Sequence, residues 1–376
     1  MAFNRDLFSE PQTSSTGPLG WVEPSVHWFT ESTRPEAVAS RRNVNRWYAD
    51  FPDPDGRLGA RLRSEVNADH YQSLDELYLH FLLTRRHTDV RYEEGGVGPD
   101  FRLYDKGKLI AGVEVASLFQ QSEWTVEQAR HSRLADAVNM RLLPTAGYFV
   151  DFQFEAAPQD PAPRHFVGWL RREVDRLPPH HQLALGADQS GNVPTAIYVK
   201  DEVRIRVRFI PMRAGAQALT DPDARIVGMG PAVGGMVLAA SRLKERIGAK
   251  AGGRYDLGDS PFLVAVGVHD TVCSDDQVVE GLYGGESVVL ASGDLIRRND
   301  GLFGIDAGKP SGRQSRLSAV AIISMFRAWK PDETDVALLR NPYASRPWPG
   351  NGLPATREFG VVDSCAAQLT LGWKQT

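Results

Sequence analysis

The chain of 376 residues is too long for one small domain, and at roughly 150 residues per domain it fits one enlarged domain or two. Its 42% hydrophobic and 24% charged residues are typical of a soluble globular protein with a substantial core. The 43 basic and 47 acidic side chains leave a formal net charge of −4, which excludes an overall basic coat for nucleic acid but allows a local basic cleft. Two cysteines, Cys273 and Cys365, are too few for a disulfide framework, so a cytoplasmic location is expected. No stretch predicts a membrane span or a leader, so no membrane partner is expected.

Prolines punctuate the first part of the chain, and they predict an extended N-terminal arm over residues 1–65. Its tryptophans indicate that part of the arm packs against the body of the protein. Residues 66–270 are expected to form an α/β core with insertions, and residues 271–376 an α+β elaboration of that core.

The first strong helix signal is Ser73-Leu-Asp-Glu76, which has the pattern of a capping box and predicts a helix over 73–86. Strands are expected over 89–93, 100–104 and 109–118, with a turn at 105–108. A helix over 125–142 and a strand over 148–154 follow. The predicted order is therefore α-β-β-β-α-β.

The pattern is looser after residue 158. Helices are expected over 165–176, 236–250 and 276–283. A pair of strands is expected around 196–211, and single strands over 262–268, 287–291 and 317–326. A tail rich in proline and tryptophan completes the chain. Residues 228–235 are glycine-rich, but their spacing disfavours a dinucleotide-binding loop, so a nicotinamide-dependent enzyme is the least favoured function.

Asp100 and Glu114 are the most informative residues. If the three residues 106–108 form the loop of a hairpin, Asp105 lies opposite Leu109, and counting back places Asp100 opposite Glu114. Two neighbouring carboxylates raise each other's pKa unless a cation lies between them. Hard oxygen ligands favour Mg²⁺ or Mn²⁺ at such a position.

Over residues 73–154, the order of helix, three strands, helix and strand, with Pro99-Asp100 and Glu114, resembles the PD-(D/E)XK nuclease superfamily. This resemblance implies a restriction-endonuclease-like core, a mixed central sheet flanked by helices, and metal-dependent hydrolysis of phosphodiester bonds in DNA. Asp100 and Glu114 match the metal-binding acids of the family, and Glu76 matches an acidic residue of its first helix. Capping of the helix is the alternative role for Glu76. Defence and DNA repair are the biological settings considered.

Ala116 departs from the family pattern, because the resemblance places a lysine there. Another cation must then assist the attacking water and the developing negative charge. Arg133 and His131 are the favoured replacements, since their helix is expected to cross the same sheet, and Arg130 and Lys244 are alternatives. Ser117, Gln120 and Gln121 are further candidates for positioning water.

Arg204, Arg206 and Arg208 alternate along one strand and therefore share a face. This face is expected to contact the phosphate backbone of DNA, with a solvated edge strand as the alternative. The absence of the motif lysine leaves a second function open, in which a decayed nuclease fold binds nucleic acid or assembles with partners. A homodimer or a partner protein is compatible with either function.

Overall fold

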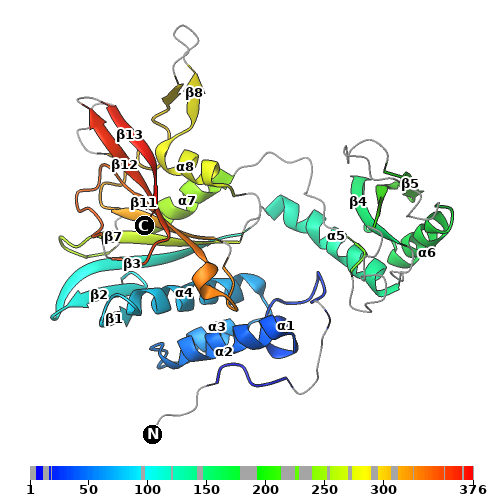
Figure 1. Ribbon diagram of the computed structural model, residues 1–376, viewed down its shortest axis with the longest axis horizontal. Coiled ribbons are helices and arrows are strands. Elements are labelled where there is room, and N and C mark those ends of the chain that lie inside the picture. Colours follow the sequence, from blue (N-terminus) through cyan, green and yellow to red (C-terminus); the bar gives the residue numbers. More distant parts are fainter. Residues whose placement is uncertain are drawn as a thin grey trace.

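A mixed eight-stranded sheet organises the chain, in the order β1-β2-β3-β7-β10-β11-β12-β13 (Figure 1). Its strands are β1 (Asp89–Tyr92), β2 (Phe101–Asp105), β3 (Lys108–Leu118), β7 (Phe262–Val268), β10 (Ala319–Ser324), β11 (Asp335–Arg340), β12 (Arg357–Cys365) and β13 (Gln368–Gln375). This computed structural model describes the chain apart from residues 1–5, 12–16, 18, 95–97, 120–121, 142–146, 178–192, 213–224, 228–238, 252–254, 270–272, 289–294, 306–311, 325, 351, 366–367 and 376. The prediction of a mixed α/β protein with a central sheet flanked by helices is confirmed.

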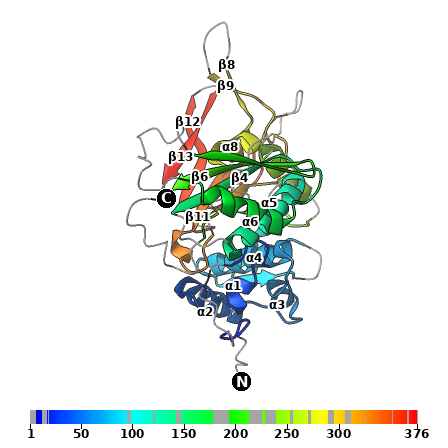
Figure 2. The same cartoon turned by 90° about the vertical axis from the view of Figure 1, so that its right-hand side faces the viewer.

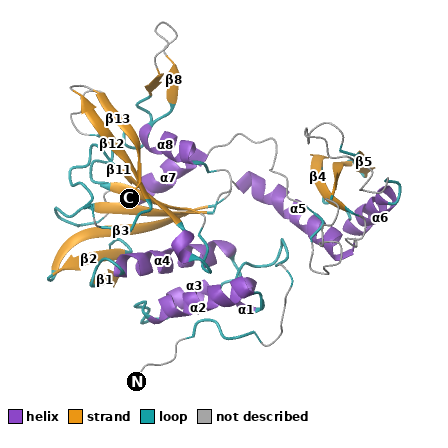
Figure 3. Cartoon of the chain, in the orientation of Figure 1, coloured by secondary structure: helices purple, strands orange, loops and turns teal. Residues whose placement is uncertain are grey.

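Helices cover both faces of this sheet because its central strands are apolar on both sides. In β3, Val113 and Val115 belong to the core shared with helix α4 (Asn67–Thr84). Ala116 and Leu118, on the opposite face, belong to the core shared with helices α7 (Ala239–Ala251) and α8 (Asp275–Tyr283). The alternation along one strand therefore places successive side chains in two separate cores. Figure 3 shows α4 and α7 on opposite sides of β3.

Helix α4 begins six residues before the predicted start, at Asn67. Ser73 therefore lies inside the helix, where its hydroxyl donates a hydrogen bond to the Asp69 carbonyl oxygen rather than capping a helix end. The predicted capping box is wrong, so Glu76 does not cap the start of this helix. A true capping box occurs at α8, where the Ser274 side chain accepts a hydrogen bond from the Gln277 backbone N–H.

The first part of the chain is helical where an extended arm was expected. Helices α1 (His27–Thr30), α2 (Pro35–Ala49) and α3 (Arg57–Leu62) precede α4. The prolines of this segment predicted an extended chain, but Pro35 occupies the first turn of α2, where its fixed φ and missing N–H are tolerated. The expected anchoring by tryptophan is confirmed by Trp47, which is 2% exposed and lies 5.5 Å from the ring of Tyr78 in α4.

A second sheet interrupts the predicted core. Helices α5 (Ser122–Arg141) and α6 (Pro163–Val174) pack on strands β4 (Tyr148–Ala156), β5 (Thr195–Lys200) and β6 (Val203–Pro211), which pair in the order β4-β6-β5. Figures 1 and 2 show this unit beside the main sheet. Strand β4 therefore does not join the main sheet. The parallel neighbour of β3 is β7, which is reached through α7.

The last hundred residues extend the same main sheet. Strand β10 pairs parallel with β7, and β11, β12 and β13 follow outward. Strands β11, β12 and β13 were not predicted for this tail, most of whose prolines lie in the connection between β11 and β12. The short strands β8 (Glu286–Val288) and β9 (Leu295–Arg297) form a separate ribbon, and a short 3₁₀ helix, Pro331–Glu333, precedes β11.

Candidate active site

The pairing of β2 with β3 brings Asp100 beside Glu114. Phe101 lies opposite Val113, so the next residues outward are Asp100 and Glu114. The Asp100 backbone N–H donates to Glu114 Oε2 at 3.3 Å, and the Val115 N–H donates to Asp100 Oδ2 at 2.6 Å. The predicted juxtaposition of the two carboxylates is therefore present.

The turn that produces this register differs from the expected one. Asp105 pairs with Lys108 around the two central residues Lys106 and Gly107, whose φ angles are +50° and +77°, as in the tight primed turns of hairpins. A bulge at Ile110 then adds one residue to β3. The shorter turn and the bulge compensate, which restores the register that the three-residue loop implied.

Burial and neighbouring charge perturb this pair. Glu114 is 3% exposed and Asp100 is half-buried. Desolvation, and then the negative charge of Glu114, raise the pKa of Asp100 to about 7, against the opposing effects of the Val115 N–H and the Lys250 ammonium. A carboxyl group that titrates near neutral pH beside a second acid is typical of functional sites.

Lys250 supplies the cation beside these acids. Its Nζ lies 2.6 Å from Glu114 Oε1, and it reaches β3 from the last turn of α7. Lys250 was not among the predicted site residues, since it lies 136 residues after Glu114. The missed signal was a lysine at the end of the helix that leads into the strongest predicted strand, β7.

The cations that were predicted for this role lie elsewhere. Arg133 and Arg130 pair with Asp160, and His131 stacks on Phe152 at 4.3 Å, so all three belong to the unit of the second sheet. The structure thus corrects the assignment of Arg133 and His131, because α5 packs on its own sheet and not across β3. Lys244 donates to the Asp300 carbonyl oxygen. Residues 120 and 121, proposed to position water, lie outside the described residues.

Glu76 lies near the acid pair but is held by other groups. Its charge contributes to the raised pKa of Asp100. Arg61 donates to both of its carboxylate oxygens, at 2.9 and 2.6 Å, and the Tyr92 hydroxyl donates to Oε2 at 2.8 Å. These three hydrogen bonds engage the Glu76 carboxylate more fully than the carboxylate of Asp100 or Glu114, so Glu76 is the least suited of the three to bind a metal.

A second polar cluster connects α4 to the far end of β3 and was not predicted. Asp75 is 1% exposed and accepts hydrogen bonds from the Ser117 hydroxyl at 2.6 Å and from His269 Nε2 at 2.9 Å. Gly267 makes this approach possible, since a Cβ there would stand 2.0 Å from Asp75 Oδ2. Ser117 therefore anchors a buried carboxylate rather than facing the acid pair.

Arg204, Arg206 and Arg208 share one face of β6, as predicted, but acids on β4 accompany them. Glu155 lies 2.5 Å from both Arg204 and Arg206, and Asp151 lies 3.6 Å from Arg208. Three positive and two negative charges leave this face only weakly basic. The glycine-rich segment 228–235 lies outside the described residues.

Comparison with protein-family models, curated proteins and solved structures gives no match. Within the described residues, no three His, Cys, Asp or Glu side chains are grouped closely enough to hold a metal ion. Within the same residues, no helix is both long enough and apolar enough to cross a membrane.

Proposed function

We propose that this protein is a metal-dependent nuclease that hydrolyses phosphodiester bonds in DNA, with Asp100, Glu114 and Lys250 as its catalytic residues. The observation that carries the proposal is the meeting of two carboxylates and one ammonium group on adjacent elements. The order α4, β1, β2, β3, α7 and β7 supports a restriction-endonuclease-like core, once the unit of the second sheet is treated as an insertion between β3 and α7.

The acid pair fits a hard divalent cation. Within the described residues, Asp100 Oδ2 and the two Glu114 oxygens each accept one hydrogen bond from an N–H group, which leaves lone pairs on each carboxylate for a metal. A bound Mg²⁺ or Mn²⁺ would lower the pKa of a water molecule and polarise the phosphate. It would also relieve the repulsion that raises the pKa of Asp100.

Lys250 is suited to the role left open by Ala116. Its side chain is 30% exposed, and an ammonium group has three N–H donors, of which Glu114 takes one. The remaining donors would orient the attacking water or stabilise negative charge on the phosphoryl oxygens. Glu76, fixed by Arg61 and Tyr92, would act as a positioning residue that keeps negative charge beside Asp100.

One observation favours the alternative, a decayed nuclease fold that binds nucleic acid or assembles with partners. Lys250 and Arg61 already balance the negative charges of Glu114 and Glu76, so these two carboxylates do not require a metal ion for charge compensation. A thermal-shift measurement separates the two functions, because a cation that binds only the folded state raises the melting temperature. Stabilisation by Mg²⁺ or Mn²⁺ that is lost in Asp100→Asn and Glu114→Gln supports the nuclease, and its absence from the wild type supports the alternative.

Cleavage of labelled single-stranded and double-stranded DNA with Mg²⁺ or Mn²⁺ tests the reaction directly. We expect Asp100→Asn, Glu114→Gln and Lys250→Met each to lower the cleavage rate by about 100-fold or more. Lys244→Met is the matched control. Lys244 lies in the same helix as Lys250, but its ammonium group donates to the Asp300 carbonyl oxygen and not to the acid pair. Equal activity of Lys250→Met and Lys244→Met would refute the role of Lys250, and no cleavage by the folded wild type would refute the proposed reaction.

A further inference from the structure

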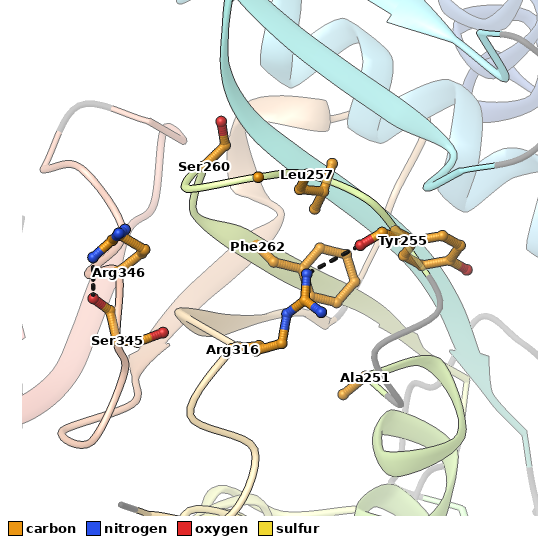
Figure 4. A pocket seen from close by; sticks show the side chains of 9 residues that line it. Ala251, Tyr255, Leu257, Ser260, Phe262, Arg316, Ser345 and Arg346 are labelled. Atoms are coloured by element: carbon orange, nitrogen blue, oxygen red, sulfur yellow. Dashed lines mark hydrogen bonds between the residues drawn. The ribbon is translucent and has the colours of Figure 1, made fainter.

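A shallow hollow lies beside the acid pair, between α7 and the starts of β7 and β10. It is open to solvent. Figure 4 shows the Phe262 ring between Tyr255 on one side and Ser345 with Arg346 on the other, with Arg316 reaching toward the Tyr255 backbone. None of these residues belongs to the catalytic group proposed above.

The sheet register places this hollow close to Glu114. Phe262 pairs with Gly112, and Val264 pairs with Glu114, so Phe262 lies one strand across and two residues back on the same face. A spacing of about 4.8 Å between strands and a rise of about 3.3 Å per residue along them put the Cα atoms of Phe262 and Glu114 about 8 Å apart. The wall between the two sites is shared, because Ala251 follows Lys250 directly in α7 and lines the hollow.

Leu257 seals the floor of the hollow toward the acid pair. Its Cδ1 would stand 2.7 Å from a Cβ added to Gly112, and the ring of Pro99, which precedes Asp100, would stand 3.2 Å from the same point. Leu257 is 5% exposed and Phe262 is 6% exposed, so the base of the hollow is apolar. The lack of a side chain at Gly112 keeps Leu257 and Pro99 in this position.

Arg316 provides charge at the rim of this apolar base. Its Nη2 donates to the Tyr255 carbonyl oxygen at 3.1 Å, which holds the exposed side chain across the hollow. Within the described part of the chain, Arg316 forms no ion pair with a carboxylate, whereas Arg346 pairs with Asp259. A guanidinium group has five N–H donors, so most of those on Arg316 are available to a ligand.

We infer that this hollow is a subsite for the sugar-phosphate backbone of single-stranded DNA, with Arg316 contacting a phosphate one or two nucleotides from the scissile bond. The inference rests on the proposed function for its direction, because the acid pair defines where the scissile phosphate lies. An apolar base accommodates the sugar, and a guanidinium group makes paired hydrogen bonds to phosphate oxygens. Because β7, which carries Phe262, is the neighbouring strand of β3, a DNA strand bound at the acid pair would pass close to the hollow.

Fluorescence anisotropy with a short labelled single-stranded DNA tests this subsite without requiring cleavage. Binding is measured in EDTA over a range of salt concentrations, for the wild type, Arg316→Ala and Arg176→Ala. Arg176 is the matched control, since it is an exposed arginine near the end of α6 in the unit of the second sheet. We expect Arg316→Ala to weaken binding about threefold to tenfold and to reduce the slope of log K against log salt by about 0.7, the value for one phosphate contact. The control should match the wild type in both.

The outcomes separate this subsite from the nuclease proposal. A reduced slope for Arg316→Ala supports the subsite even if the wild type does not cleave DNA, and in that case only the catalytic proposal fails. A wild type that cleaves DNA, together with an Arg316→Ala variant whose affinity and slope are unchanged, overturns the subsite alone. Equal weakening by Arg316→Ala and Arg176→Ala also overturns it, because the effect would then be one of net charge. Absence of binding by the wild type overturns the subsite.

Discussion

Replacing Asp100 with asparagine should stabilise the metal-free protein at neutral and alkaline pH. The pKa of Asp100 is raised to about 7 by desolvation and by Glu114, whereas the unfolded chain has the ordinary value near 3.9. The folded protein therefore holds this proton more tightly than the unfolded chain. The favourable contribution of Asp100 is complete below about pH 4 and is lost as the pH rises to about 7. Asp100→Asn keeps a neutral side chain at every pH.

The size of the effect follows from the shift. Three pKa units correspond to an upper value of about 4 kcal/mol, at 1.36 kcal/mol per unit. Asp100 keeps some contact with solvent, so we expect about 2 kcal/mol at pH 8 and almost no difference at pH 4. Urea unfolding of both proteins at several pH values, with EDTA present, measures the difference.

A second condition extends this prediction. With Mg²⁺ at pH 8, the wild type should gain stability and the variant should not, so the difference between them should shrink. An equal or lower stability of Asp100→Asn at pH 8 without metal would show that Asp100 is not under charge repulsion. The acid pair would then have no charge repulsion for a cation to relieve.

Three further predictions concern individual contacts. Asp53→Asn should show the opposite pH dependence and should destabilise the protein by about 2 kcal/mol at pH 7. Hydrogen bonds outweigh desolvation and lower the pKa of Asp53, so the contribution of Asp53 to stability is present above about pH 4 and is lost as the pH falls. Urea unfolding at pH 3 and pH 7 measures this difference. Lys250→Met should lower stability by about 2 kcal/mol by leaving Glu114 buried without its partner, whereas Lys244→Met should change it by less than about 0.5 kcal/mol in the same assay. Gly267→Ala should lower stability by about 2–3 kcal/mol, because the new methyl group would displace the buried carboxylate of Asp75; a normal melting temperature would contradict the close approach.

Much of the local structure could be predicted from the sequence because its signals are short-range. Strand β7 was predicted with its observed bounds, and β1, β2 and β3 within about one residue at each end, since alternation and apolar runs are local properties. The pairing of Asp100 with Glu114 was predicted for the same reason, because a hairpin joins neighbours in the chain. The turn and the bulge were not predicted, yet they cancel in the register.

The tertiary structure alone decided which helix crosses the sheet at the acid pair. An insertion with its own core separates β3 from α7, so the next helix in sequence, with Arg133 and His131, packs elsewhere. Lys250 reaches Glu114 only because β7 pairs in parallel with β3, and a parallel pair needs a crossover whose length no local pattern specifies. The sequence by itself therefore determined the two acids, and long-range strand pairing determined the cation that completes the site.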